Sequence, residues 1–292
     1  MENAELKQNE RATWTRVVPG WAKWDEVLTR CAAPVSARLL ELAGVRPGHH
    51  VLDIASGTGE PALTAASRVG PEGSVVGMDF VEPMLAHARE KATKRGLDNV
   101  AFRCVDGEEL DVPAASFDAV TIRWGLMFMP DPVACLSRCH AALREGGRLS
   151  ASCWAEPERN PWAAIPAAAI RKHFALPAPP AGAPGLFALA DPRRLKSTVE
   201  AAGFTDVEVV EQSVGWGPFD SREHAFRFIS ELAGPIASML ASVPEEMRAS
   251  IEKEIADAYG GFASDPGIVL PGVTWIVSAT RAPSGAGRTT PR

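Results

Sequence analysis

The sequence predicts an α/β fold in which a mostly parallel seven-stranded sheet carries helices on both faces. The first observation is the alternation of short apolar runs with segments of helical periodicity through residues 49–154. Strands that are joined by helices run parallel, and the helices cover both faces of the sheet. The second observation is a glycine loop at 56–59, directly after the first apolar run. The third is the return of strand and helix patterns in 191–280, after a Pro-rich segment.

Residues 1–48 are expected to form an N-terminal helical cap. Apolar residues from Trp21 to Ala43 follow the spacing of helical faces. A proline in the helix interior removes a backbone donor and clashes with the preceding turn. We therefore expect two short helices with a break at Pro34, ended by Gly44.

Residues 49–154 are expected to form the ligand-binding core. Its first strand is a short apolar run between turn residues, which is typical of a buried strand. Glycines follow two of its helical segments and mark their ends. The expected strands are 49–55, 74–79, 100–105, 117–123 and 148–154, and the expected helices are 60–69, 82–95 and 132–144. This is a Rossmann-like arrangement, in which ligands bind at the carboxyl ends of the strands.

Two insertions and a tail are expected beyond the core. Seven prolines lie in the apolar segment 155–190, which we interpret as a lid insertion. The C-terminal part of the core, 191–280, contains a second, helical insertion at 221–262. The tail at 281–292 is rich in Gly, Pro, Ser and Thr and is expected to be disordered. The remaining core elements are a helix at 191–202, which Asp191 caps, and strands at 204–214 and 273–280.

Composition indicates one catalytic domain in the cytoplasm. The 292 residues are 46% apolar and carry a formal charge of −6, which argues against a nucleic-acid partner because binding phosphates requires clustered Lys and Arg. The five cysteines are scattered and contain no Cys-x-x-Cys pair, so no disulfide framework and no metal site are expected. Neither a leader peptide nor a membrane-inserted segment is expected from the apolar runs.

The loop Ser56, Gly57, Thr58 and Gly59 is suited to a nucleotide. Its glycines allow a sharp turn and close approach of a ligand, and the following helix offers free N–H donors. The same residues, with an acid about 20 positions later, also satisfy the fingerprint of NAD-binding domains. The loop alone leaves both cofactors open.

Acidic residues next to the loop distinguish the two cofactors. Asp79 ends the second strand, where its carboxylate can accept both hydroxyl protons of a ribose or can cap the next helix. Asp53 lies inside an apolar strand, and a buried carboxylate requires donors, such as loop amides or a ligand ammonium. A negative site suits a sulfonium and would repel a pyrophosphate. Asp106, after the third strand, can accept from the amine of adenine or belong to an ordinary acidic turn.

Six ordered motifs resemble those of class I methyltransferases that use S-adenosylmethionine (SAM). The likeness is greatest to the branch of ubiquinone/menaquinone-biosynthesis and antibiotic-tailoring enzymes, and it spans roughly residues 45–154. The motifs are 51–59, 76–79, 84–89, Asp106, 117–120 and 143–149.

The resemblance implies a set of cofactor contacts. Gly57 and Gly59 would line the methionine portion, Asp79 would hold the ribose, and Asp106 with Gly107 would contact adenine. Phe80 and Met84 are candidates for the wall of the adenosine pocket. Arg123 and Trp124 occupy the strand end at which such enzymes place residues beside the cofactor and the acceptor. The positive charge of Arg123 is a departure, because the sulfonium expected beside it is also positive. Arg123 could pair with the methionine carboxylate, with an acidic acceptor, with Asp53, or in a purely structural ion pair.

Other candidates are aromatic or titratable. Trp14, Trp21 and Trp24 could form a lid over the cofactor, because aromatic faces attract a sulfonium, or could belong to the core. His173 in the lid insertion and His224 in the helical insertion are candidate catalytic bases, or surface histidines.

The function expected from these residues is methyl transfer from SAM to O, C or N of a small, partly apolar metabolite, of quinone, polyketide or other natural-product type. Aromatic residues in or beside the insertions favour such an acceptor, although they could equally be core. The alternatives are a SAM-binding enzyme that does not methylate, such as a cyclase, and an NAD-dependent oxidoreductase. The sequence also allows a homodimer. The aromatic residues in question are Trp154, Trp162, Phe174, Phe187, Trp216, Phe226 and Phe228.

Overall fold

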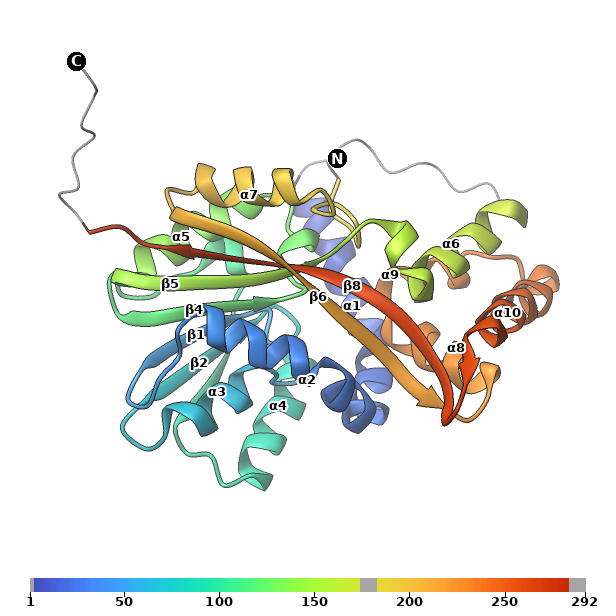
Figure 1. The fold of residues 1–292 in the computed structure, drawn as a ribbon, viewed down its shortest axis with the longest axis horizontal. Helices are drawn as coiled ribbons and strands as arrows, with labels where there is room; N and C mark the ends of the chain where they lie inside the picture. The colour runs from blue at the N-terminus through green and yellow to red at the C-terminus, as the bar shows by residue number, and fades with distance from the viewer. Residues whose placement is uncertain (1–2, 174–182, 284–292) are drawn as a thin grey trace, which may run out of the picture.

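The predicted seven-stranded, mostly parallel sheet is confirmed by the computed structural model, which describes residues 3–173 and 183–283 (Figure 1). The strand order is β3-β2-β1-β4-β5-β8-β6, with a two-residue strand, β7, added beside β8. The first five strands pair in parallel, whereas β8 runs antiparallel to both β5 and β6. The strands are β1 (His50–Ile54), β2 (Ser74–Asp79), β3 (Val100–Cys104), β4 (Phe117–Arg123), β5 (Leu143–Trp154), β6 (Thr205–Phe219), β7 (Ala263–Ser264) and β8 (Gly267–Thr280).

Helices cover both faces of this sheet. In Figure 1, α2, α3 and α4 lie on one side of it and α5 and α7 on the other. The α-helices are α1 (Asn3–Lys23), α2 (Asp25–Leu42), α3 (Ala62–Val69), α4 (Glu82–Lys94), α5 (Pro132–Ala142), α6 (Pro161–His173), α7 (Pro192–Ala201), α8 (Arg222–Leu232), α9 (Gly234–Ala241) and α10 (Glu245–Tyr259). Single 3₁₀ turns are η1 (Gly107–Glu109), η2 (Leu126–Phe128), η3 (Pro157–Arg159) and η4 (Gly260–Phe262).

The central strands are apolar because both of their faces are buried. Val51, Leu52 and Ile54 of β1 are at most 1% exposed. Val51 packs with α3 and α4, whereas Leu52 and Ile54 belong to the larger core cluster on the opposite face. Because successive side chains of a strand point to opposite faces, β1 contributes to both core clusters.

The long antiparallel strand pair of β6 and β8 carries the sheet beyond this core, where α6, α8, α9 and α10 gather (Figure 1). Both strands are longer than predicted, since β6 reaches Phe219 and β8 begins at Gly267. The additional residues include Trp216 and Leu270, which are buried against the helical insertion. Of the predicted lid, residues 174–182 lie outside the described part of the chain, as do residues 284–292 of the predicted tail.

The expected helix break at Pro34 is wrong. Helix α2 continues through Pro34, and the boundary between α1 and α2 falls at Trp24. Val35 and Leu39, which follow Pro34, are fully buried, so their packing outweighs the loss of one backbone hydrogen bond. Helix α1 also begins much earlier than the apolar pattern indicated. At Gly20 it lies directly on α8, because a Cβ there would be 2.1 Å from the carbonyl oxygen of Glu231.

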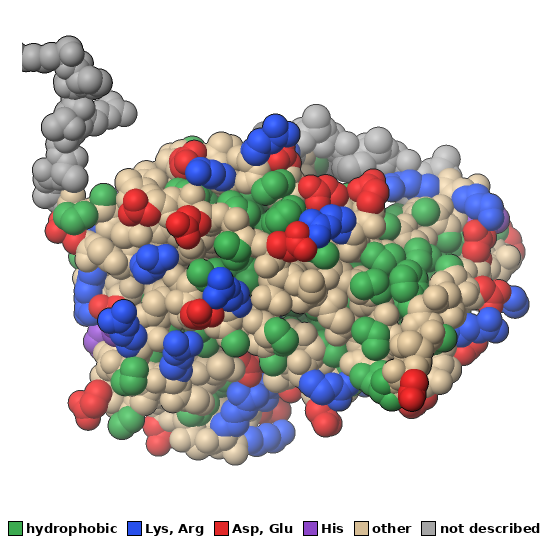
Figure 2. Space-filling model, viewed as in Figure 1, with side chains coloured by type: hydrophobic (Ala, Val, Ile, Leu, Met, Phe, Trp, Pro, Cys, Tyr) green, Lys and Arg blue, Asp and Glu red, His purple; other side chains and the backbone are tan. Residues whose placement is uncertain are grey.

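The molecular surface is mixed in charge. Figure 2 shows basic and acidic side chains interspersed over the face that it draws, beside an apolar area near the strand pair of β6 and β8. Within the described residues, no helix has both the length and the apolar composition needed to cross a membrane.

Candidate functional site

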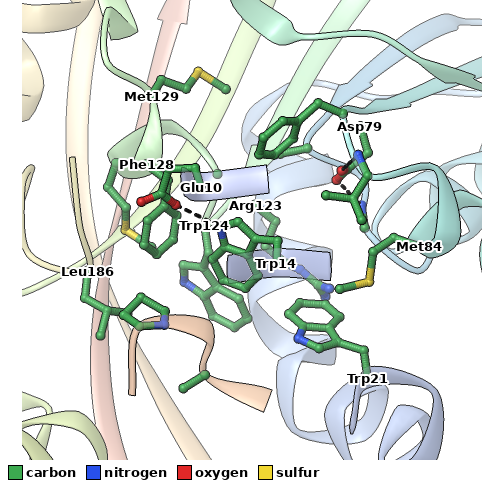
Figure 3. Close-up of a pocket in the computed structure, with 18 of the residues that line it drawn as sticks. Glu10, Trp14, Trp21, Asp79, Met84, Arg123, Trp124, Phe128, Met129 and Leu186 are labelled. Atoms are coloured by element: carbon green, nitrogen blue, oxygen red, sulfur yellow. Dashed lines mark hydrogen bonds between the residues drawn. The ribbon is translucent and has the colours of Figure 1, made fainter. Parts of the chain in front are cut away.

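A pocket that is partly open to solvent lies at the carboxyl ends of β1, β2 and β4 (Figure 3). Helix α1 forms one of its walls, and residues of β5, β6, α6 and α8 contribute to another. This is the edge at which parallel α/β sheets bind ligands. Most of its lining is apolar, and the few charged groups therefore stand out.

The glycine loop forms one end of the pocket. Ala55 and Gly57 line it and have φ angles of 55° and 51°, in the left-handed region that favours glycine. Gly59 has a φ of 105°, and a Cβ there would lie 2.8 Å from a methyl of Leu63. Gly59 therefore permits close packing of the loop on α3, and it does not line the pocket.

Asp79 joins the end of β2 to this loop. Its Oδ2 accepts a hydrogen bond from the amide of Gly57 and its Oδ1 accepts one from the amide of Val81, both at 2.9 Å. Burial raises the pKa of Asp79 to about 6, although both amide bonds act in the opposite direction. Asp79, Phe80 and Met84 all line the pocket, so the carboxylate orders the turn and also faces the cavity.

Asp53, before the loop, and Ser56, its first residue, are both buried and do not line the pocket. Asp53 is fully buried, and its Oδ1 accepts a hydrogen bond of 2.6 Å from the hydroxyl of Thr121 on β4. Burial raises the pKa of Asp53 to about 7. The structure thus favours the interpretation in which Asp53 stabilises the strand end below the loop, rather than direct contact with a ligand.

Asp106 and Gly107 line the opposite side of this end of the pocket. Asp106 caps η1 by accepting from the amide of Glu108, as an acidic turn would. Its Oδ2 also lies 2.8 Å from the ammonium of Lys7 on α1, which is 2.9 Å from Glu108 as well. Burial alone would lower the pKa of Lys7, but hydrogen bonds to these two carboxylates raise it above its ordinary value.

Arg123 is a buried cation in the pocket wall. It is 8% exposed, its Nη1 donates to the hydroxyl of Ser36 at 2.9 Å, and its guanidinium lies 5.3 Å from the ring centre of Trp124. The carboxylates of Glu60, Asp53 and Asp25 act on its charge, but none of them forms an ion pair with it in the described structure. Of the pairings considered for Arg123, those with the methionine carboxylate and with an acidic acceptor therefore stay open.

Four aromatic residues form a continuous wall around Trp124, a set we call the aromatic wall. Trp124 stacks on Trp154 at 4.5 Å and 16°, with a φ of 56° that turns its ring into the pocket region. The indole N–H of Trp216 has no hydrogen-bond partner in the described structure. With Trp124, the aromatic wall comprises Trp154, Trp162, Trp216 and Phe228. Of the other predicted aromatics, Phe187 and Phe226 do not line the pocket, and Phe174 lies outside the described residues.

The predicted tryptophan lid is only partly present. Trp14 and Trp21 of α1 line the pocket, where their rings meet edge to face at 6.2 Å (Figure 3). Trp24 does not line it. Its indole N–H donates to Glu231 at 2.6 Å and its ring packs on Phe228, because the end of α1 turns it toward α8.

Neither candidate catalytic histidine reaches the pocket. His173 pairs with Glu254 across α6 and α10, with 2.7 Å between Nε2 and Oε2. The ring of His224 packs against Trp24 and Phe219 at 5.2 and 5.5 Å. His173 thus joins α6 to α10, and His224 packs α8 against Trp24 and the end of β6. The prediction of a catalytic base at these two positions is corrected, because neither side chain lines the pocket.

Lys7 and Glu10 were not predicted, although both line the pocket. Glu10 accepts a hydrogen bond from the indole of Trp14 at 3.1 Å, and burial raises its pKa. The i, i+4 spacing of Glu10 and Trp14 was a usable signal. The polar character of the first eleven residues hid this signal, because the apolar pattern on which the helical prediction rested begins only at Trp21.

Comparison with known proteins assigns the fold and relates it to a chemistry. The sequence profile described as a methyltransferase domain matches residues 46–202, more than half of the chain. The chain is 36% identical over 198 residues to nocamycin O-methyltransferase of Saccharothrix syringae, covering 62% of this chain and 68% of that protein. It is also 36% identical over 127 residues to an aklanonic acid methyltransferase of Streptomyces, covering 44% of this chain and 58% of that protein, less than two thirds of its length.

A solved structure has the same fold. Phosphoethanolamine N-methyltransferase 2 of Haemonchus contortus, in complex with phosphomonomethylethanolamine and S-adenosylhomocysteine, superposes with a TM-score of 0.52 at 20% identity. The match covers 86% of this chain and 53% of that chain.

Proposed function

We propose, from the premise that this chain belongs to the SAM-dependent methyltransferase family, that it transfers a methyl group from SAM to a small, partly apolar metabolite. Family membership removes the NAD-dependent oxidoreductase as an interpretation of the glycine loop. The nature of the acceptor is our proposal, and it is supported by the two relatives that are named after natural products.

The observation that carries the proposal is a division of the pocket into two unlike halves. One half is built by the ends of β1, β2 and β3 and contains the glycine loop, Asp79 and Asp106. The other half is built from β4 onward and consists of the aromatic wall, further apolar side chains and Arg123. A polar nucleotide half next to an apolar half suits a nucleotide-linked donor and an apolar acceptor.

The residues of the first half fit SAM. The Asp79 carboxylate faces the pocket and retains acceptor capacity for ribose hydroxyls, while Phe80 and Met84 offer apolar surface to adenosine. Asp106 and Gly107 would contact adenine, with Lys7 moving aside or sharing the carboxylate. Trp14 and Trp21 would present aromatic faces to the positive sulfonium.

The chemistry that SAM supplies when bound is an electrophilic methyl group. The residues of this chain align the acceptor with it and exclude water, which supplies much of the acceleration in such a displacement. The aromatic wall and α1 perform both tasks, because the aromatic wall lines the acceptor half of the pocket and α1 lines the cofactor half.

We expect SAM binding to depend on pH through Asp79. Its pKa is raised to about 6, so the group is a carboxylate above that pH and loses acceptor capacity as the pH falls below it. Calorimetric titration with S-adenosylhomocysteine (SAH) from pH 8 to 5 should show constant affinity at first and then a decline through about 6. Asp79→Asn should bind more weakly and show no decline; an unchanged profile in this variant would exclude Asp79 as the source.

The remaining proposals concern partners and location. We propose a small molecule rather than a nucleic acid as partner, and the cytoplasm as the location. A homodimer remains a prediction that light scattering of the purified protein tests directly.

The proposed function is tested by incubating the protein with isotope-labelled SAM and metabolite extract of the producing cells. Mass spectrometry should find the label in one or a few small apolar compounds. Binding of SAM without any labelled product would favour a non-methylating enzyme such as a cyclase, and label in nucleic acid or protein would contradict the small-molecule acceptor.

A further inference from the structure

The apolar half of the pocket contains a single charged residue. Among the described lining residues that β4 and later elements contribute, Arg123 is the one with a charge. The acidic lining residues Glu10, Asp79, Asp106 and Glu108 come from α1 or from the β2 and β3 ends. The acceptor would thus meet one cation in apolar surroundings.

That cation is under-partnered for a buried group. A guanidinium has five N–H donors, and a buried charge is costly unless a counter-charge and hydrogen bonds compensate it. Arg123 is 8% exposed, but its one hydrogen bond to a described residue goes to the neutral hydroxyl of Ser36. The carboxylates of Glu60, Asp53 and Asp25 act on its charge, but none of them forms an ion pair with it in the part of the chain that is described. Since Arg123 lines the cavity, an anion bound there would supply what the protein does not.

The surroundings of Arg123 are flat and aromatic. The guanidinium lies over the ring of Trp124, and this ring in turn contacts the rings of Trp154 and Trp216. Trp216 is 4% exposed and its indole N–H is unpaired. A planar ring system can pack on such a wall, and a carbonyl oxygen on it could accept from this indole after a small shift.

We propose that the acceptor is a planar aromatic acid whose anionic group pairs with Arg123 while its rings pack against the aromatic wall. This inference rests on the proposed function and specifies its substrate class. Arg123 is then the residue that selects an anionic over a neutral acceptor and fixes its orientation.

The test compares anthraquinone-2-carboxylate with its neutral carboxamide, by calorimetry on the SAH-saturated protein. The wild-type protein should bind the carboxylate at least about tenfold more tightly than the carboxamide, as expected for a charge-assisted hydrogen bond. Arg123→Met should remove this preference, and Arg123→Lys should retain part of it because the charge remains. SAH affinity should change less than about threefold in both variants.

Controls separate this inference from the function on which it rests. Arg16→Met removes a cation of α1 that donates to Ser238 outside the pocket, and it should leave the preference intact. SAH is titrated first into the wild-type protein, and failure of SAH to bind contradicts the proposed function. The two probes are also titrated without SAH, so the preference for the carboxylate is still measured in that case.

Two results would overturn the inference. The first is a wild-type protein that binds neither probe or binds both equally. The second is Arg123→Met that keeps the preference for the carboxylate. If this variant also loses SAH affinity, Arg123 is assigned to the methionine carboxylate of the cofactor. Because the comparison of two probes on the wild-type protein needs no variant, poor folding of Arg123→Met would not hide a negative answer.

Discussion

Replacing Asp79 with Ala is expected to weaken SAH binding by about 100-fold or more. The carboxylate is the acceptor proposed for two ribose hydroxyls, and hydrogen bonds to a charged group contribute about 1.5–3 kcal/mol each. The variant also leaves the amides of Gly57 and Val81 without their acceptor, so the glycine loop loses its attachment to β2. Calorimetric titration with SAH measures the loss.

A structural effect is separated from a binding effect by Asp118→Asn. Asp118 also accepts a cross-strand amide bond, from His50 at 2.7 Å, and it pairs with Arg144, but it lies outside the pocket. Thermal unfolding should show destabilisation of both variants, and only Asp79→Ala should lose SAH affinity. Unchanged affinity in a folded Asp79→Ala protein would exclude the ribose assignment.

Gly125→Ala is expected to destabilise the protein by about 1–3 kcal/mol and to weaken SAH binding. A Cβ at Gly125 would lie 2.3 Å from the Cβ of Ala55, which real structures do not tolerate. These residues end the turns after β4 and β1, and both line the pocket. Relief of the overlap must therefore move the glycine loop, the β4 end, or both. Denaturant unfolding measures the stability.

The double variant Ala55→Gly/Gly125→Ala is the matched test of this cause. Removal of the Ala55 methyl abolishes the overlap and suits its φ of 55°, so the double variant should recover most of the stability and affinity. Ala55→Gly alone should be near neutral or slightly stabilising. A double variant as damaged as Gly125→Ala alone would show that the overlap is not the cause.

The parts of the fold that could be predicted from sequence are those set by local pattern. The strand before the glycine loop was found within one residue at each end, because a buried parallel strand is a bare apolar run between turn residues. Gly57 and Asp79 could be placed in the site because each directly follows or ends a predicted strand. The two strands pair in parallel, so these residues lie at the same edge of the sheet. The resemblance to methyltransferases added Asp106 and Gly107 as adenine contacts, and the family itself is confirmed by the sequence profile.

What could not be predicted depends on contacts between distant segments. Pro34 does not break its helix because Val35 and Leu39 are buried against the sheet. Trp24 and His224 pack on each other from elements 200 residues apart in the chain, which no helical spacing reveals. The polar face of α1 gave no sign that Lys7 would reach the β3 end.

Six of the eight tryptophans of the protein line the pocket, and only Trp24 and Trp275 do not. The intrinsic fluorescence of the protein therefore comes mainly from the cavity that receives its ligands. Donor and acceptor should be distinguishable by emission alone, since Trp14 and Trp21 border the cofactor half whereas the others belong to the aromatic wall. The enzyme thus contains its own optical reporter, with which candidate acceptors can be screened without label.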